Sequence, residues 1–435
     1  MMMRLAFALM LFALPLRAEV AIREVTSPGG ITAWLVEEHG IPFTALEIRF
    51  RGGTSLDAPG KRGAVNLMTA LIEEGAGDLD AQGFAAARDG LAASFSFGSG
   101  MDSLSVSAKF LTENRGQVVD LLRSALVAPR FDAESVERVR GQVLSGLQTD
   151  AKDPKALAAR AFDAAAFGDH PYGSSGDGTP ESVAILTRDD IVSAHKGALA
   201  LDRIYVAAVG DITAAQLGTL LDTLLGDLPA NGAPLPGRAE WGMAGGTTVR
   251  AFPTPQSVVR FGHQGITRDD PDFFAAYILN EVLGGSGFGS RLMTEVREKR
   301  GLTYGISTYI APMDQAEVHM GQFASANEKV AEAIAIIRTE WSKIAEDGIT
   351  AEEMAATKTF LTGSYPLRFD GNGPIANILV GMQMEGLPID YAATRNAKIE
   401  AVTQDDLSRV AKRLVLPGQL HFVVVGQPVG VVTGG

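Results

Sequence analysis

Cysteine is missing altogether from this chain of 435 residues. Without a thiol, the chain can form no disulfide, no thiolate metal site and no cysteine nucleophile. Its stability must therefore come from the burial of apolar side chains. Histidine is scarce as well, because the sequence has only 6 and no two of them are spaced as His-x-x-x-His. No helix can therefore present a pair of imidazoles to one metal ion.

Positive charge and long apolar runs are also in short supply. The chain has 38 lysine and arginine residues against 51 aspartate and glutamate residues, and its net charge is −13 at pH 7. Binding to nucleic acid requires clustered lysine and arginine, so no nucleic-acid partner is expected. Beyond the N-terminal residues, no segment is long and apolar enough to span a bilayer, so no integral membrane segment is expected after signal removal.

The N-terminal residues have the layout of a secretory signal peptide. A basic start at residues 1–4 precedes an apolar run at residues 5–16, and Ala18 supplies a small residue at a plausible cleavage site. Leu16 and Arg17 make that site imperfect, and a buried N-terminal helix is the alternative. We predict a signal peptide at residues 1–18 and an exported, periplasmic protein. The remaining chain, of roughly 400 residues, is too long for a single core and indicates two domains.

An internal repeat is the main sign of organisation. Each half contains an alternating strand, a turn, an apolar helix and a glycine stop, in that order. The first copy covers residues 43–50, 51–55, 64–72 and 75–77, and the second covers residues 257–262, 267–272, 273–283 and 284–285. We expect aspartate and proline at residues 269–272 to cap the second apolar helix.

Further strands and helices complete each half. A β-rich run that ends in glycine closes each half, at residues 203–212 and 421–428, and a segment rich in proline and glycine separates the halves. Long helical patterns cover residues 134–151, 154–167, 214–225, 328–346, 351–361 and 404–414. The pattern predicts an α+β protein made of two homologous α/β sandwich domains, each an antiparallel-rich sheet packed against helices. We place the domains at residues 19–225 and 246–435, with a linker at residues 226–245.

The chain resembles the pitrilysin and insulinase superfamily of zinc peptidases, family M16, over essentially its whole mature length. The most specific segment is residues 290–305, Ser-Arg-Leu-Met-Thr-Glu-Val-Arg-Glu-Lys-Arg-Gly-Leu-Thr-Tyr-Gly. Supporting segments are residues 53–57, 170–173, 178–181 and 209–211. The likeness is greatest to the small M16B-like bacterial subunits similar to those of mitochondrial processing peptidase, and it implies an M16 metallopeptidase-like (LuxS/MPP-like) fold.

The resemblance also shows where a zinc site would lie. The family carries an inverted His-x-x-Glu-His on the first helix of the first half, with a third ligand, a glutamate, on a later helix. Here Asn66 and Ala70 stand at the histidine positions, Thr69 at the glutamate that acts as base, and Gly146 at the third ligand. Catalytic zinc needs about three ligands from histidine, cysteine or carboxylate, so we predict no metal bound by this chain. Glu73 and Glu74 are expected to be solvated residues at the end of the same helix.

The second half keeps the residues that, in the family, contact substrate across the cleft. These are an arginine and a tyrosine, matched here by Arg297 and Tyr304. A phenol or guanidinium donor at the carbonyl oxygen of a peptide stabilises the charge that develops as water attacks. The alternative is a surface arginine and an aromatic at the edge of the core.

A glycine-rich loop precedes that motif at residues 284–290. It lacks the lysine of a P-loop and the complete Gly-x-Ser-x-Gly of a serine hydrolase, so neither a nucleotide site nor a nucleophile is expected. The resemblance implies a loop that faces substrate, whereas a simple connection between helices is the alternative. The predicted substrate-binding residues are Gly284, Gly285, Ser286, Gly287 and Gly289. The alternating segments 93–98 and 103–109 predict two strands, one at the place where relatives add substrate to a sheet edge.

These observations predict the non-zinc subunit of an exported heterodimeric peptidase. A homologous partner with an intact zinc motif would hold the zinc, and the pair would enclose a chamber for unfolded peptides. Alone, the chain would bind no zinc and cleave nothing. A catalytically inert scaffold and a peptide-binding homodimer remain the alternatives, and the sequence does not identify the substrate.

Overall fold

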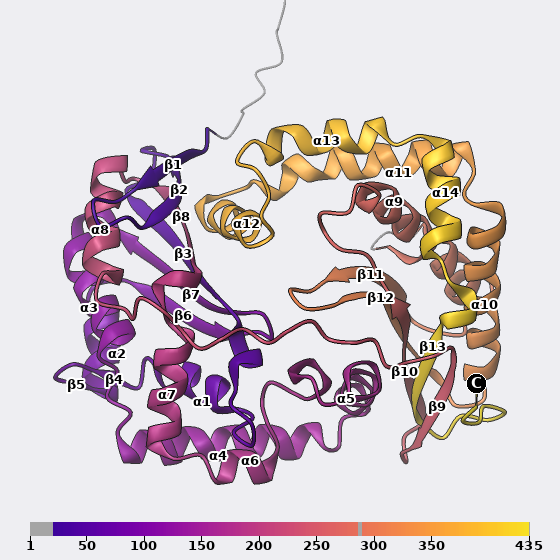
Figure 1. Cartoon of the computed structure of the whole chain (residues 1–435), viewed down its shortest axis with the longest axis horizontal. Helices are drawn as coiled ribbons and strands as arrows, with labels where there is room; N and C mark the ends of the chain where they lie inside the picture. Colours follow the sequence, from indigo (N-terminus) through magenta and orange to yellow (C-terminus); the bar gives the residue numbers. More distant parts are fainter. Residues whose placement is uncertain (1–20, 286–288, 435) are drawn as a thin grey trace, which may run out of the picture.

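The computed structural model describes residues 21–285 and 289–434. The predicted signal peptide lies outside the described residues. Two halves, each with its own sheet and helices, stand side by side in Figure 1, the first in indigo to magenta and the second in orange to yellow. Among the described residues, no helix has both the length and the apolar character that a membrane crossing needs.

The sheet of the first half has the strand order β1-β2-β8-β3-β7-β6. Neighbouring strands are antiparallel except β2 and β8, which are parallel. The strands are β1 (Arg23–Thr26), β2 (Thr32–Glu37), β3 (Phe43–Arg51), β6 (Ser94–Ser99), β7 (Ser103–Leu111) and β8 (Ile204–Gly210). A short two-stranded sheet pairs β4 (Gly75–Ala76) with β5 (Leu79–Asp80).

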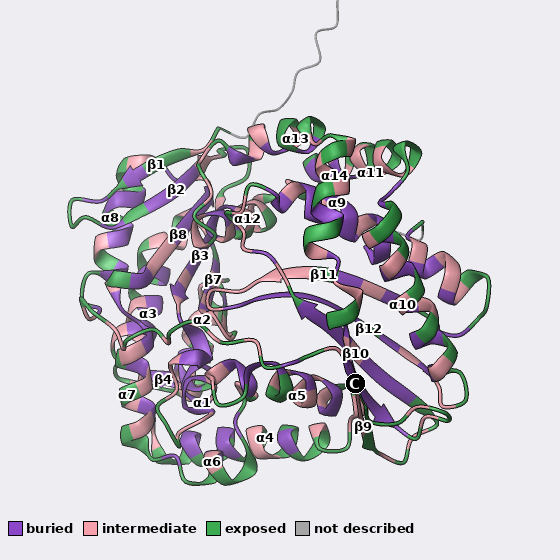
Figure 2. Cartoon of the chain, turned by 45° about the vertical axis from the view of Figure 1, so that its right-hand side comes forward, coloured by how far each residue is buried: buried purple, intermediate pink, exposed green. Residues whose placement is uncertain are grey.

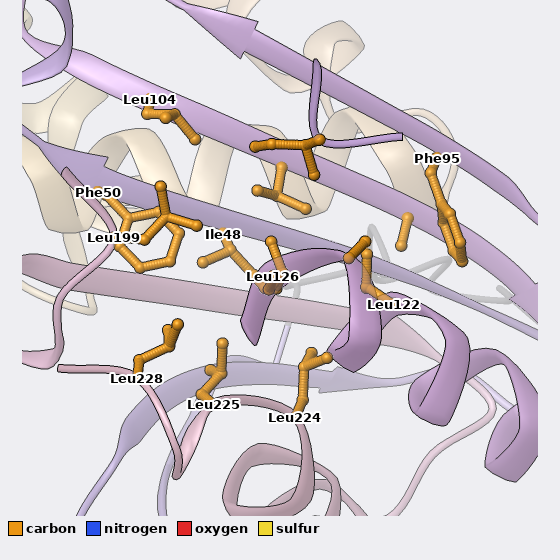
Figure 3. Close-up of a cluster of buried hydrophobic side chains, with 14 of the residues drawn as sticks. Ile48, Phe50, Phe95, Leu104, Leu122, Leu126, Leu199, Leu224, Leu225 and Leu228 are labelled. Atoms are coloured by element: carbon orange, nitrogen blue, oxygen red, sulfur yellow. The ribbon is translucent and has the colours of Figure 1, made fainter. Parts of the chain in front are cut away.

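Helices of the first half cover one face of this sheet. The side chains of Ile48 and Phe50 on β3 and Leu104 on β7 meet Leu122 and the other helix residues in a continuous apolar core (Figure 3). The helices are α1 (Ala64–Leu71), α2 (Ala81–Gly90), α3 (Arg115–Val127), α4 (Ala133–Asp150), α5 (Pro154–Phe167), α6 (Pro180–Ala184), α7 (Arg188–Ala198) and α8 (Ala214–Leu225). Alternate residues of β3 point to the core, as the two-residue period of a strand requires.

The second half repeats this arrangement with the sheet order β11-β12-β10-β13-β9. Here β13 and β9 are parallel and the other neighbours are antiparallel. The strands are β9 (Gly246–Ala251), β10 (Gln256–Gln264), β11 (Ile306–Pro312), β12 (Glu317–Ala326) and β13 (His421–Gly426). The helices are α9 (Phe273–Gly284), α10 (Val330–Asp347), α11 (Ala351–Ser364), α12 (Asn372–Met384), α13 (Tyr391–Ala401) and α14 (Gln404–Leu414).

The predicted repeat is therefore visible in the topology. The order β2-β8-β3-β7-β6 of the first sheet has the same connectivity and directions as β9-β13-β10-β12-β11 of the second, and β1 is an addition. The last helix before each closing strand carries the same cap. Thr187 before α7 and Thr403 before α14 each exchange hydrogen bonds with an aspartate three residues later, Asp190 and Asp406.

Each half also lends one helix to the sheet of the other. Helix α12 of the second half packs on β3 and β8, where Trp34 and Val209 bury against Leu379 and Val380. Helix α5 of the first half packs on β10 and β13, with Leu157 among the buried side chains. Both sheets are consequently covered on two faces, and Figure 2 shows buried residues along β10 and β12. The halves are joined by apolar packing as well as by the linker.

The linker contains no helix or strand between residues 226 and 245, but it is anchored to the halves. Leu228 and Met243 are buried, and Trp241 packs edge-on against Phe162 and Phe167 of α5. The Gly242 N–H donates to the Ala166 carbonyl at 2.7 Å. The composition predicts a linker here, and these contacts hold the linker against α5.

The cap predicted before α9 is at the expected position but does not make the expected hydrogen bond. Asp272 lies at the start of α9, but its side chain makes no capping hydrogen bond. Instead it accepts from Arg409 at 2.7 Å and pairs with Arg413, both on α14. Two guanidinium groups outcompete a backbone N–H for the carboxylate because charge-assisted bonds are the stronger ones. The residue joins two helices rather than ending one.

Candidate functional site

Helix α1 carries the positions at which the family resemblance places zinc ligands. Asn66 is half-buried, and its Oδ1 accepts a hydrogen bond of 2.9 Å from Ser99 on the edge strand β6. Thr69 is buried and donates to the Val65 carbonyl at 2.7 Å, while Ala70 is exposed. Gly146 lies on α4, which packs against α1, and it is exposed. The four positions belong to two adjoining helices, and none offers an imidazole or a carboxylate.

The two glutamates that follow α1 form ion pairs. Glu73 pairs with Arg88 of α2 at 2.9 Å, and Glu74 pairs with Arg138 of α4. We predicted that both glutamates would be solvated, but their ion pairs connect α1 to α2 and α4. Over the described part of the chain, no group of three or more histidine or acidic residues could hold a metal ion. The donor set that zinc prefers is thus missing around α1.

The predicted substrate-contacting pair lies in the second half, before the edge strand β11. Arg297 is half-buried within a π-helical turn, Met293–Glu298, and its carbonyl accepts from the Gly301 N–H at 2.8 Å. Tyr304 follows at a bend, with 89% of its surface exposed. Such exposure of a large aromatic side chain leaves the whole phenol available to another molecule.

The backbone around Tyr304 is held by its neighbours. The buried Thr303 hydroxyl donates to the Ala324 carbonyl on β12 at 2.7 Å, and the Ser325 hydroxyl donates to the Leu302 carbonyl at 2.5 Å. Two side-chain contacts to the adjacent strand therefore fix the backbone immediately before the bend. The tyrosine ring projects from a positioned support rather than from a free loop.

The glycine-rich loop is only partly described. Ser286 and Gly287 lie outside the described residues. Gly284 and Gly285 are buried at the end of α9, and an added Cβ would approach Thr308 to 2.6 Å at Gly284 and Glu281 to 2.1 Å at Gly285. Those two glycines are therefore required by packing. Gly289 is exposed with open space around it.

The predicted strands 93–98 and 103–109 form β6 and β7, and β6 pairs with β7 alone among the described strands. The equivalent outer strand of the second sheet is β11, which begins two residues after Tyr304. An edge strand presents unpaired backbone groups that can accept another strand. Both α1 and Tyr304 are thus next to a sheet edge.

A polar cluster where the halves meet has no counterpart in the sequence prediction. The β11–β12 turn reaches the first half, where Asp314 pairs with Arg51 at 2.6 Å and its N–H donates to Asp102 at 3.2 Å. Tyr172 donates to Asp102 through its hydroxyl, which accepts from the Gln315 N–H at 3.0 Å. Burial raises the pKa of Asp102, although the Tyr172 hydrogen bond opposes it. Residues this distant in sequence carry no local pattern that would have grouped them.

Comparison with known proteins tests the predicted resemblance. Residues 186–361 match the family model described as the peptidase M16 inactive domain. The predicted resemblance to the M16 peptidase family and the predicted α+β fold class are confirmed by this match and by the relatives below.

Three relatives extend the likeness over most of the chain. The crystal structure of a peptidase M16 inactive domain from Pseudomonas fluorescens superposes with a TM-score of 0.88 and 26% identity, covering 95% of this chain and 99% of that one. The non-peptidase homolog YmxG of Helicobacter pylori is 27% identical over 89% of this chain and 90% of its own length. The mitochondrial-processing peptidase subunit beta of Blastocladiella emersonii is 22% identical over 73% of this chain and 70% of its own length. The descriptions "inactive domain" and "non-peptidase homolog" support the prediction that this chain is not an active peptidase alone.

Proposed function

We propose that this chain is the non-zinc subunit of an exported, heterodimeric M16B-type zinc peptidase. Its partner is a homologous subunit with an intact His-x-x-Glu-His motif, and the substrate is an unfolded peptide. The two sandwich domains at residues 19–225 and 246–435 form part of the chamber wall. The likeness to a subunit of mitochondrial processing peptidase supports a paired arrangement.

The exposure of Tyr304 carries the proposal. A tyrosine with 89% of its surface exposed gains nothing from burial, so its place on a rigid bend needs another explanation. The zinc of the partner would activate water. Tyr304 would donate its phenol hydrogen to the carbonyl oxygen as negative charge develops there, and Arg297 would hold the peptide backbone. A donor in that position contributes about 3 kcal/mol to transition-state stabilisation, or roughly a hundredfold in rate.

The test uses the pair of subunits reconstituted from purified chains. Tyr304→Phe should lower kcat roughly a hundredfold while the pair still assembles, as measured by gel filtration. Tyr309→Phe is the matched control, because that tyrosine lies five residues further along the chain, on the edge strand β11, and is 38% exposed. Arg297→Gln should raise KM and lower kcat, whereas Arg300→Gln, which loses its 2.7 Å pair with Glu295, should do neither. Unchanged turnover in Tyr304→Phe would refute the role of the phenol.

A catalytically inert scaffold or a peptide-binding homodimer is the second candidate. The lack of zinc-binding side chains at Asn66, Thr69, Ala70 and Gly146 favours it equally. The oligomeric state of the purified chain, the zinc content of the native complex and its peptidase activity separate the two. A stable homodimer that binds peptides, with no zinc-bearing partner in the native complex, would replace the peptidase proposal.

Export is part of the same proposal. The N-terminal residue of the mature protein, determined from a periplasmic fraction, tests it directly. Cleavage near Ala18 is expected, and an intact Met1 in the cytoplasmic fraction would contradict the periplasmic assignment.

A further inference from the structure

A cavity of about 220 Å³ lies in the second half, between α9, α11 and α13. Tyr277 and Glu281 of α9 line one side, and Ser364 of α11 lines another. Tyr365 follows α11, and Arg395 belongs to α13. Sequence analysis did not single out any of these residues. Neither Arg297 nor Tyr304 is among the residues that line it.

The internal repeat relates this cavity to the place where zinc would bind in the first half. Between residues 64 and 72, every residue is buried except Asn66 and Ala70. Between residues 275 and 283, every residue is buried except Tyr277 and Glu281. The two patterns coincide when the numbers are shifted by 211, that is, 275 minus 64. Tyr277 and Glu281 therefore occupy the places of Asn66 and Ala70.

The second helix of each half gives the same correspondence. Helices α4 and α11 begin after Asp132 and Thr350, so their numbers differ by 218, that is, 350 minus 132. Gly146, at the third ligand position, then corresponds to Ser364. All three counterparts of the zinc positions line the cavity. The cavity thus lies at the place in the second half that corresponds to the vacant zinc positions of the first half, and different side chains line it.

Arg395 determines which ligand this space can take. Three arginines of the described chain are buried, and two of them, Arg140 and Arg203, pair with carboxylates at 3.2 Å and 2.9 Å. Arg395 is only 6% exposed, yet the ion pairs found among the described residues do not include it. Its guanidinium donates to the Leu361 carbonyl at 3.1 Å and to Asn396 at 3.2 Å, and it lies 4.2 Å from the centre of the Tyr365 ring. A buried cation without a counter-ion favours an anion beside it.

The rest of the lining adds aromatic surface and a second cation. The rings of Tyr277 and Tyr365 face the cavity, and the half-exposed Phe360 extends this apolar surface toward solvent. Arg368 is exposed at the rim. Glu281 is the one carboxylate of the lining and there is no histidine, so a metal ion is not a suitable ligand. One acid beside two guanidinium groups leaves the cavity positive and able to accept a single negative charge.

We propose that this cavity binds the α-carboxylate of an amino-acid residue with an aromatic or large apolar side chain. Arg395 pairs with the carboxylate, Arg368 adds charge at the rim, and the side chain packs on the rings of Tyr277 and Tyr365. The residue is either a free amino acid or the C-terminal residue of a peptide. A cavity of about 220 Å³ is large enough for one such residue. The site needs neither the zinc of a partner nor the substrate contacts of Tyr304.

Calorimetric titration of the purified full chain tests the proposal. N-acetyl-L-phenylalanine should bind, and its C-terminal amide should bind at least about tenfold more weakly, because the pair with Arg395 is lost. L-Phenylalanine and a short peptide ending in phenylalanine identify the source, according to which of the two binds more tightly. For both the free amino acid and the peptide, the form with a free carboxylate should bind more tightly than the corresponding amide.

Variants locate the binding. Arg395→Gln should weaken binding about tenfold or more, and Arg368→Gln should weaken it severalfold. Arg250→Gln, at an exposed position of β9, is the matched control and should leave it unchanged. If Arg395→Gln is misfolded by circular dichroism, Ser364→Phe decides, because it fills the cavity and should abolish binding. No heat up to about 10 mM ligand, equal affinity for acid and amide, or full binding by Ser364→Phe would each overturn the proposal.

Discussion

The stability of the second half should fall steeply in acid because of a buried histidine. His263 on β10 has no exposed surface, and its ring lies 5.2 Å from that of His319 and 5.8 Å from that of Trp341. Its Nε2 accepts from the Trp341 indole at 3.1 Å, and its Nδ1 lies 2.7 Å from the Gln264 carbonyl, to which it donates. One acceptor and one donor describe a neutral imidazole, so protonation would place a second donor against the indole N–H.

The magnitude follows from the two states of the ring. Burial lowers the pKa of His263 to about 4, whereas in the unfolded chain it has the ordinary value of 6.5. Above pH 6.5 neither state is protonated, and stability is unaffected. Below it the unfolded chain takes up a proton that the fold excludes, at about 1.4 kcal/mol per pH unit. Stability should therefore decline by about 3 kcal/mol as the pH falls from 6.5 to 4, and His319, whose pKa burial also lowers, adds to the decline.

The perturbation is His263→Gln, which keeps a donor and an acceptor but cannot titrate. At pH 7.5 the variant should be less stable by about 1–3 kcal/mol, because the amide does not reproduce the geometry of the ring. Its loss of stability between pH 7.5 and 4.5 should be smaller than that of the unaltered chain by about 2.7 kcal/mol. Urea denaturation at both pH values, followed by tryptophan fluorescence, measures the difference.

His39→Gln is the control, because the sign there is opposite. Hydrogen bonding to Asp211, at 2.7 Å, raises the pKa of His39. Its contribution to stability is present below the ordinary pKa and is lost as the pH rises, so this variant should not reduce the acid loss. If His263→Gln and the unaltered chain lose stability in parallel, to within about 0.5 kcal/mol, the ring is not excluded from protonation and the reasoning fails.

Three further predictions concern the contacts between the halves and the helix caps within each half. Leu379→Ala on α12 should lower the free energy of unfolding by about 2–5 kcal/mol, since this fully buried side chain packs on the other half's sheet; urea titration measures it. Thr187→Ala and Thr403→Ala should each cost about 1 kcal/mol and should add in the double variant, because the two capping boxes are in different halves. Arg51→Ala should cost about 1–3 kcal/mol by calorimetry, since it removes the pair with Asp314 and leaves that carboxylate without its cation.

The two capping variants have a matched control. Thr219→Ala, at an exposed position inside α8, should change stability by less than about 0.5 kcal/mol. Losses of similar size at Thr219 and Thr187 would show that the cap is not the cause. For Leu379→Ala, a loss below about 1 kcal/mol would show that α12 does not contribute to the packing between the halves.

Local patterns predicted well those elements whose apolar residues have regular spacing. The helices at 154–167, 214–225 and 404–414 have the predicted bounds, and the strand at 43–50 is extended by a single residue. The apolar face of each helix is long enough for the 3.6-residue period to be unambiguous. The same spacing does not reveal which sheet a helix packs on, so the docking of α5 and α12 on the opposite halves was not predicted.

The candidate site was predictable only where a sequence motif surrounds it. The segment around Arg297 and Tyr304 is contiguous, and so is the altered zinc helix around Asn66. The cavity beside Arg395 is assembled from three helices far apart in the chain, and no single segment contains its pattern. The internal repeat was the signal that could have located it, because the apolar helix at residues 273–283 corresponds to the one at residues 64–72.

The exchange of helices between the halves has a consequence for how such a chain can be divided. Each sheet depends on a helix encoded in the other half of the gene, α12 for the first and α5 for the second. Cutting the chain within residues 226–245 would therefore yield two fragments, each with an uncovered apolar face and a surplus helix that fits the other fragment. Fusion into one chain makes their association intramolecular, with an effective concentration in about the millimolar range. Two separately encoded fragments would have to be co-expressed at that concentration to obtain the same fold.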